Sequence, residues 1–170
     1  DPSNSQGDLE DFMQVPTFGT YCWLETKSFH QDPSIVMDRI FSIGGQKGWY
    51  FMTWIWKLRG FLDKLFGGVG SGRGRRNEKK VLPGDALDFW RVLIADRQKM
   101  RLLLYAEMKL PGEGWLEFRI EKQKTGWVLY QKATFRPHGI WGRIYWLSMF
   151  PFHCVLFKGM IKKLTEGEKS

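Results

Sequence analysis

Residues 114–136, GWLEFRIEKQKTGWVLYQKATFR, have the pattern of two β-strands joined by a hairpin turn. In the first strand Leu116 and Phe118 alternate with Glu117 and Arg119, as expected when one face of a strand is buried and the other is solvated. The connection KQKTG has hairpin length and contains a turn-forming glycine. We therefore predict an antiparallel pair with one apolar face and one charged face.

Two similar runs precede this pair, DALDFWRVLIA at residues 85–95 and MRLLLYAEMKL at residues 100–110. In the second run Leu102 and Leu104 fall on one face and Glu107 on the other. The connections ADRQK and LPGEG are again short and rich in turn residues. The four runs predict an antiparallel meander with one strand in each run.

Helical patterns flank the meander. After a strand predicted at residues 21–30, Asp32 and Pro33 indicate the start of a short helix, and a second helix is expected over residues 54–66. After Pro137 the chain is helical and apolar again. The proline and the charges within this segment argue against a transmembrane span, so we predict a long helix packed along the sheet and kinked or restarted at Pro151.

Length and charge favour one domain with an acidic N-terminal junction. A chain of 170 residues suits a single domain, which we place at residues 20–170. Residues 1–19 hold four acidic residues and no basic one, so the remainder carries a formal charge of +12. We expect residues 1–19 to be a flexible linker in a piece of a longer polypeptide. Cys22 and Cys154 lack metal-ligand spacing, which favours a cytoplasmic protein without a metal site.

Four blocks of sequence resemble a bacterial domain family of unknown function in the START-like, polyketide-cyclase-like (SRPBCC) superfamily: LPGDALDFWRV, AEMKLPGEGWLEF, QKATFRPHGIWGRIYWLSMFPFH and FKGM. The resemblance spans about residues 21–165. It implies an α+β helix-grip fold, in which a curved antiparallel sheet wraps a long C-terminal helix and leaves a cavity for apolar small molecules. Members of the family often follow a Rossmann-type NAD(P)-binding domain of the nucleoside-diphosphate-sugar epimerase kind. The resemblance implies no reaction and no cofactor.

The leading functional hypothesis is a domain that binds an apolar or amphipathic small molecule. Nine Trp and thirteen Phe are many for this length, and such side chains suit a wide core or a cavity wall. Gln131 falls on the apolar face of its strand, where its amide either bonds a neighbouring element or offers a hydrogen bond to a ligand. The candidate ligand-binding residues are Trp90, Gln131, Phe135, Tyr145, Met149 and His153.

An enzyme of the cyclase or hydrolase type is the second hypothesis. The favoured interpretation of Glu107 and Glu117 is a solvated ladder, with Glu117 near Lys132 or Thr134 and Glu107 near Lys109 or Arg91. If that face were concave instead, both glutamates and Asp88 would crowd together, and one carboxyl pKa would rise toward acid-base use. His153 is either a packed histidine or a general base.

A basic surface module is the third hypothesis. The glycine-rich stretch at residues 67–80 contains Arg73, Arg75 and Arg76, which make either a weak anion site or a mobile surface hairpin. With Lys57, Arg59 and Lys64, these arginines would meet the phosphates of anionic lipid or nucleic acid. No specific nucleic-acid target is predicted.

Overall fold

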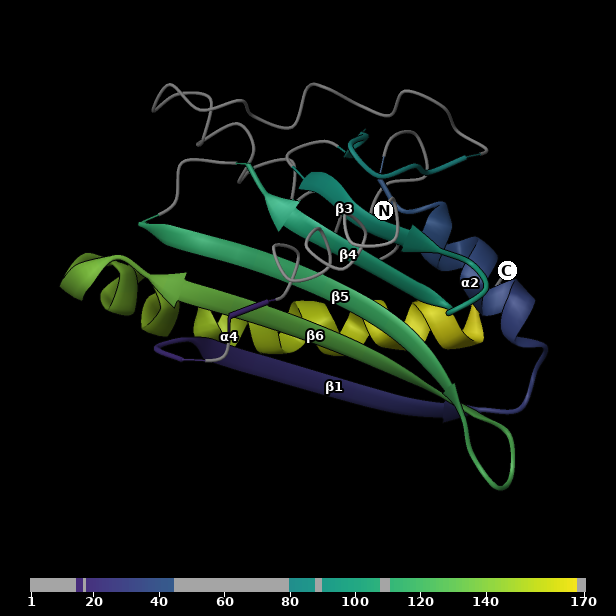
Figure 1. Cartoon of the computed structure of the whole chain (residues 1–170). Helices are drawn as coiled ribbons and strands as arrows, with labels where there is room; N and C mark the ends of the chain where they lie inside the picture. Colours follow the sequence, from purple (N-terminus) through teal and green to yellow (C-terminus); the bar gives the residue numbers. More distant parts are fainter. Residues whose placement is uncertain (1–14, 17, 45–79, 88–89, 108–110, 168–170) are drawn as a thin grey trace.

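The computed structural model describes residues 15–16, 18–44, 80–87, 90–107 and 111–167. These residues form six strands and two helices, which Figure 1 shows as one curved sheet with a long helix lying across it. In chain order the elements are β1 (Tyr21–Phe29), α2 (Pro33–Phe41), β2 (Ala86–Leu87), β3 (Trp90–Asp96), β4 (Arg101–Ala106), β5 (Gly112–Lys122), β6 (Trp127–Pro137) and α4 (Gly139–Glu166). The helix expected at residues 54–66 and most of the expected linker lie outside the described residues.

The sheet is antiparallel with the order β1-β6-β5-β4-β3-β2. The predicted hairpin at residues 114–136 is confirmed, with Leu116 opposite Ala133 and Phe118 opposite Gln131. The prediction of a single strand at residues 85–95 was wrong. β2 and β3 are antiparallel neighbours, with Ala86 opposite Arg91 and Leu87 opposite Trp90, so the run contains two strands.

The apolar face of the sheet is buried against the helices, as the alternation predicted. The shared core is made by residues from β4, β5, β6 and the second half of α4, and it includes Leu102, Leu104, Leu116, Phe118, Leu129, Leu156, Met160 and Leu164. Each of these side chains is almost completely removed from water. Burial at this density supplies the main stabilising free energy of the fold.

The short helix α2 begins as its sequence indicates. The side chain of Asp32 accepts a hydrogen bond from the backbone N–H of Ser34 at 2.8 Å, and Pro33 occupies the first turn. Hydrogen bonding from the side chain of Ser34, together with this backbone hydrogen bond, lowers the pKa of Asp32. The predicted N-cap is therefore confirmed, and α2 presents Val36 and Ile40 to the core.

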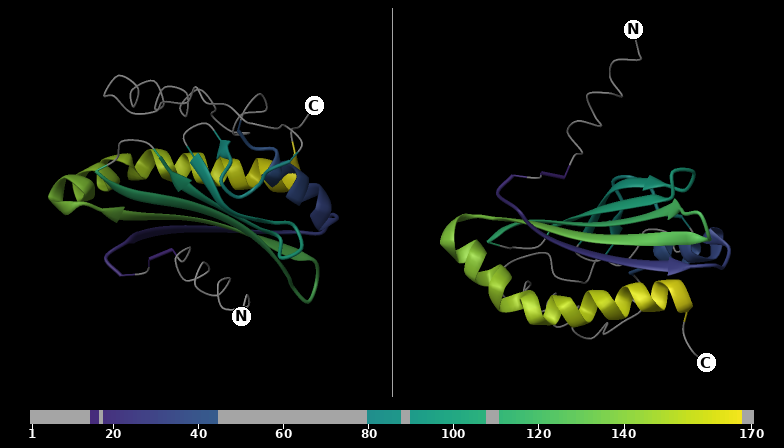
Figure 2. Two further views of the ribbon diagram at one scale, coloured as in Figure 1. Left: turned by 45° about the horizontal axis from the view of Figure 1, so that its top comes forward. Right: turned by 90° about the horizontal axis from the view of Figure 1, so that it is seen from below.

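Of the two alternatives predicted at Pro151, a kink or a restart, the restart does not occur: helix α4 continues without interruption through this residue. Figure 2 shows that the helix bends along its course. Pro151 lies on the exposed side of α4, where water can bond the carbonyl group that the proline ring leaves without a donor. By length and composition alone α4 is apolar enough to cross a membrane, and 33% of its most apolar window is buried within the fold.

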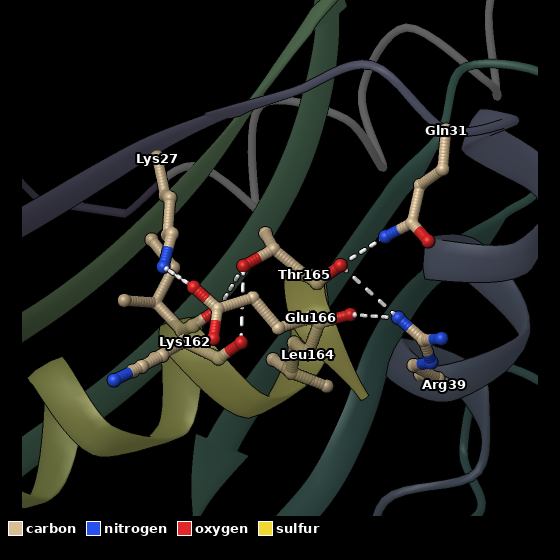
Figure 3. A network of polar contacts seen from close by, with 8 residues as sticks. Lys27, Gln31, Arg39, Lys162, Leu164, Thr165 and Glu166 are labelled. Carbon is tan, nitrogen blue, oxygen red and sulfur yellow. Dashed lines mark hydrogen bonds and ion pairs between the residues drawn. The ribbon is translucent and has the colours of Figure 1, made fainter. Parts of the chain in front are cut away.

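The C-terminal end of α4 is fixed by polar contacts from α2 and from the end of β1 (Figure 3). Arg39 Nη1 donates to the carbonyl oxygens of Leu164 and Thr165 at 3.0 and 3.2 Å, and Gln31 Nε2 also donates to Thr165. The last carbonyls of a helix have no partner within the helix, and a cation there is favoured by the helix dipole. These contacts hold α4 at one end of the sheet.

The N-terminal end of α4 has a different anchor. His138, at the N-cap, makes no side-chain capping hydrogen bond. Gly142 instead brings the helix backbone close to the β4–β5 connection: a methyl group at this position would overlap the carbonyl oxygen of Pro111 and lie 2.7 Å from Cβ of Pro137. The close approach requires a residue without a side chain.

We expect Gly142→Ala to lower the free energy of unfolding by roughly 1 to 3 kcal/mol, because backbone atoms must move to accept the methyl group. This loss outweighs the gain of about 1 kcal/mol in helix propensity. Urea unfolding measures the difference. Ser148→Ala, on the exposed side of the same helix, is the control and should change stability by less than about 0.5 kcal/mol. A Gly142→Ala variant as stable as wild type would contradict the close approach.

Candidate ligand-binding site

A polar group lies between the sheet and α4, inside an otherwise apolar layer. Gln131 on β6 is only 1% exposed, and its Nε2 donates to the carbonyl oxygen of Phe157 on α4 at 3.2 Å. Of the two roles predicted for the Gln131 amide, the hydrogen bond to a neighbouring element is thus confirmed. Its Oε1 is also buried and has no hydrogen-bond partner among the described residues. A buried acceptor without a partner is costly and uncommon, so it marks a place where a donor is missing.

Two further polar side chains belong to this region, one opposite Gln131 on β1 and one stacked on Phe157. Glu25 lies directly opposite it in the β1–β6 register, and Trp23 Nε1 donates to Glu25 Oε1 at 2.9 Å. His153 is buried on the inner side of α4 and stacks on Phe157, with ring centroids 5.3 Å apart. The sequence analysis did not single out Glu25. Its signal was that it lies, with Lys27, within the alternating face that Tyr21, Trp23 and Phe29 define on β1.

Aromatic rings continue this layer toward the N-terminal end of α4. The ring of Trp146 stacks on Phe135 with centroids 5.5 Å apart and on Tyr21 at 5.9 Å. Tyr145 contacts Phe135 at 5.7 Å, and His153 contacts Trp146 at 5.3 Å. These contacts make a continuous aromatic wall on β1, β6 and the first half of α4, and the polar group of Glu25, Gln131 and His153 adjoins its inner end.

The structure therefore brings together four of the six predicted ligand-binding residues: Gln131, Phe135, Tyr145 and His153. Met149 is half-buried on the same helix. Trp90 is buried in the core on β3, three positions from β6 in the sheet, so it lies apart from this group. Phe152 was not among the predicted ligand-binding residues, and it too lies apart from this group. Its side chain is exposed because it lies on the outer side of α4.

Glu107 lies on the opposite face of the sheet and forms an ion pair with Arg91. Arg91 Nε donates to Oε1 of Glu107 at 2.5 Å and Nη2 donates to Oε2 at 3.1 Å, and this bond raises the pKa of Arg91. The contact agrees with the ladder interpretation. The enzyme hypothesis required two of Asp88, Glu107 and His153 in one pocket. Glu107 and His153 are on opposite faces of the sheet, and Asp88 lies outside the described residues.

Glu117 is also on the outer face, where it lies opposite Leu103 and Lys132 and not opposite Glu107. Its ionic partner is Arg101, whose Nη2 donates to Oε2 at 2.5 Å. A hollow of about 190 Å³ is lined here by Val15, Arg101, Trp115, Glu117, Lys132 and Thr134. The sequence analysis predicted Lys132 or Thr134 as the neighbour of Glu117. It did not predict the ion pair with Arg101, which lies diagonally across from Glu117 on β4.

The remaining predicted sites have no structural description. Arg73, Arg75 and Arg76, with Lys57, Arg59 and Lys64, lie outside the described residues, so the anion site and the basic module stay predictions. Within the described part of the chain, no three His, Cys, Asp or Glu side chains gather as metal ligands.

A curved six-stranded antiparallel sheet that holds a long C-terminal helix defines the helix-grip fold of START-like proteins. The chain belongs to the family described as protein of unknown function DUF2867, whose profile matches residues 21–160. No curated protein matches the sequence.

Two solved structures illustrate the shared fold. Truncated norcoclaurine synthase from Thalictrum flavum is 12% identical with a TM-score of 0.51, over 92% of this chain and 99% of that chain. The di-domain ARO/CYC protein StfQ from the steffimycin biosynthetic pathway is 8% identical with a TM-score of 0.51, over 86% of this chain and 50% of that chain. At such identities the likeness extends to the fold alone.

Gln131→Met tests whether the Gln131 amide stabilises the fold or leaves a buried acceptor without a hydrogen bond. Methionine has a similar volume and removes the buried acceptor, so we expect the ligand-free variant to be as stable as wild type or more stable by up to about 1 kcal/mol. Gln31→Met is the matched control. It removes the bond to Thr165 and should cost about 0.5 to 1.5 kcal/mol. Thermal and urea unfolding measure both. A loss of several kcal/mol in Gln131→Met would show that the amide is fully satisfied in the protein.

Proposed function

We propose that this domain binds an apolar or amphipathic small molecule between the sheet and the first half of α4. The observation that carries the proposal is the buried Oε1 of Gln131, an acceptor without a partner among the described residues, beside the aromatic wall of Phe135, Tyr145 and Trp146. Aromatic walls with a few placed polar groups are typical of small-molecule sites.

The distribution of burial along α4 supports placing the ligand under its first half. From His153 onward the inner side of the helix packs into the core, through side chains such as Leu156, Met160 and Leu164. Before His153 only Gly142 and Trp146 are buried. The first half is thus held by few contacts, and its movement away from the sheet costs less than movement of the second half.

The polar group indicates which end of a ligand lies innermost. A ligand hydroxyl or amine could donate to Oε1 of Gln131, while the apolar body of the ligand lies along Trp146 and Phe135. The half-buried carboxylate of Glu25, opposite Gln131, also favours a donor and disfavours an anion. The proposed ligand is therefore an apolar molecule with a neutral or cationic donor at one end.

The superfamily comparison supports a ligand-binding role, because norcoclaurine synthase and the StfQ cyclase share the fold and are named for small-molecule chemistry. A cytoplasmic location and a neighbouring NAD(P)-binding domain that receives the ligand are part of the same proposal. No arrangement among the described residues favours a particular reaction.

Decanol and decyl methyl ether test the proposal directly. They share an apolar chain, but only the alcohol can donate a hydrogen bond. We expect both to displace anilinonaphthalene sulfonate from the wild-type chain. Decanol should bind about 5- to 10-fold more tightly, because it forms one additional buried hydrogen bond. The displacement is followed by fluorescence.

The two methionine variants identify the acceptor. In Gln131→Met the preference for the alcohol should disappear, while Gln31→Met should keep it. Displacement by neither compound, or a preference that persists in Gln131→Met, would contradict the proposed site. Mass spectrometry of an organic extract from the purified chain then identifies any molecule that co-purifies.

A further inference from the structure

Large apolar side chains are exposed along one side of α4. Their positions fall on one side of the helix, opposite the buried side chains such as Trp146 and Met160. Figure 2 shows the sheet lying along one side of α4. Their exposed fractions are between 50% and 74%. We call this surface the outer stripe, and it consists of Ile140, Trp141, Ile144, Leu147, Phe152 and Val155. Its length along the helix is about 23 Å. A contiguous exposed apolar surface of this kind marks an interaction site.

Basic side chains continue and flank the outer stripe. Lys158 and Lys162 follow Ile140 and Ile144 by eighteen residues, which is about five helical turns, so they lie in line with the stripe and are exposed. Arg143 is exposed on its flank. Glu166 is the sole acidic residue of the α4 sequence, and Lys27 Nζ binds its carboxylate at 2.5 Å. The exposed side of α4 is therefore apolar at one end, cationic at the other, and without a free acid.

This charge pattern disfavours a second copy of the chain as the partner. If two α4 helices packed antiparallel, Lys158 and Lys162 would be buried against Ile140 and Ile144 of the other copy, with no acid to pair them. If they packed parallel, the lysines of both copies would face one another. Either arrangement removes unpaired charge from water, which is costly.

We propose that the outer stripe of α4 docks on an anionic phospholipid surface. A helix with aliphatic and aromatic side chains on its exposed side and lysines at one end binds in the plane of a membrane interface, with its apolar side chains among the lipid chains. The lysines then meet lipid phosphates. The stripe is a convex helix surface, which a deformable lipid interface accommodates without a complementary groove. The inference is independent of the proposed ligand, because these side chains point away from Gln131 and Trp146.

Vesicle flotation of the full 170-residue chain tests this proposal. The probes are vesicles of phosphatidylcholine alone and of phosphatidylcholine with about one-third phosphatidylglycerol. We expect the chain to float with the anionic vesicles and several-fold less with the neutral ones, and to float less as salt rises. Absence of flotation with both kinds of vesicle would overturn the proposal.

Ile144→Gln/Leu147→Gln removes two side chains of the outer stripe. Both are at least half exposed, so the variant should keep its thermal unfolding midpoint while its lipid partition coefficient falls about tenfold or more. Leu24→Gln is the matched control, because Leu24 is a similarly exposed leucine on β1, away from the stripe. Its flotation should equal that of wild type.

Lys158→Gln/Lys162→Gln tests the cationic end and should lower binding to the anionic vesicles about tenfold without changing binding to neutral ones. Lys80→Gln/Lys124→Gln carries the same change in charge at exposed sites off α4 and is expected to bind within about twofold of wild type. Flotation that depends on the lysines but not on Ile144 and Leu147 would overturn the proposal. It would show that only electrostatic attraction holds the chain at the membrane surface, without insertion of the outer stripe. A dimer in sedimentation that Ile144→Gln/Leu147→Gln dissociates would identify a copy-to-copy interface and overturn it as well.

Discussion

The position of α4 depends on how its C-terminal end is held. Arg39 and Gln31 satisfy the last carbonyl groups of the helix, which would otherwise be left without donors next to the core. The ion pair of Lys27 with Glu166 ties the same end to β1. With that end fixed, the second half of α4 can bury its apolar side chains in the core that it shares with the sheet. The placement of Phe157 over Gln131, and of His153 beside it, follows from this anchor.

The two halves of α4 are consequently different in character. The second half is embedded in the core through five buried large apolar side chains, while the first half buries the single large apolar residue Trp146. The first half is attached chiefly by the Trp146 stack and by the backbone approach at Gly142. Stability that is unevenly distributed along one element allows one part to move while the rest stays folded. The less firmly held half is the one that carries both the aromatic wall and the outer stripe.

Much of the fold could be predicted from the sequence because local rules and tertiary structure agree there. Alternation predicted the buried inner face of β4 to β6, although Leu103, Val128 and Thr134 are buried on the other face as well. Asp32 with Pro33 marked the start of α2. The reversal between β2 and β3 could not be read from periodicity, since both sides of the turn have strand composition. The anchor of α4 was also hidden, because Arg39 and Gln31 lie more than a hundred residues from their acceptors. Glu25 was missed because charged residues in an edge strand are usually solvated.

The outer stripe departs from the usual burial of so apolar a helix. A helix that is apolar on all sides is normally buried on all sides, whereas the run from Ile140 to Phe157 was predicted only to pack along the sheet. In the described structure the sheet covers only one side of it. The apolar composition of the inner side is required by the core and the aromatic wall. No packing among the described residues explains isoleucine, leucine, tryptophan and phenylalanine on the outer side. Exposed positions of a helix tolerate polar residues at almost no cost in stability, so a purely structural helix would be amphipathic. These exposed positions could be polar without loss of stability, yet they hold large apolar residues. This is the physical reason to assign the outer side of α4 a binding role of its own.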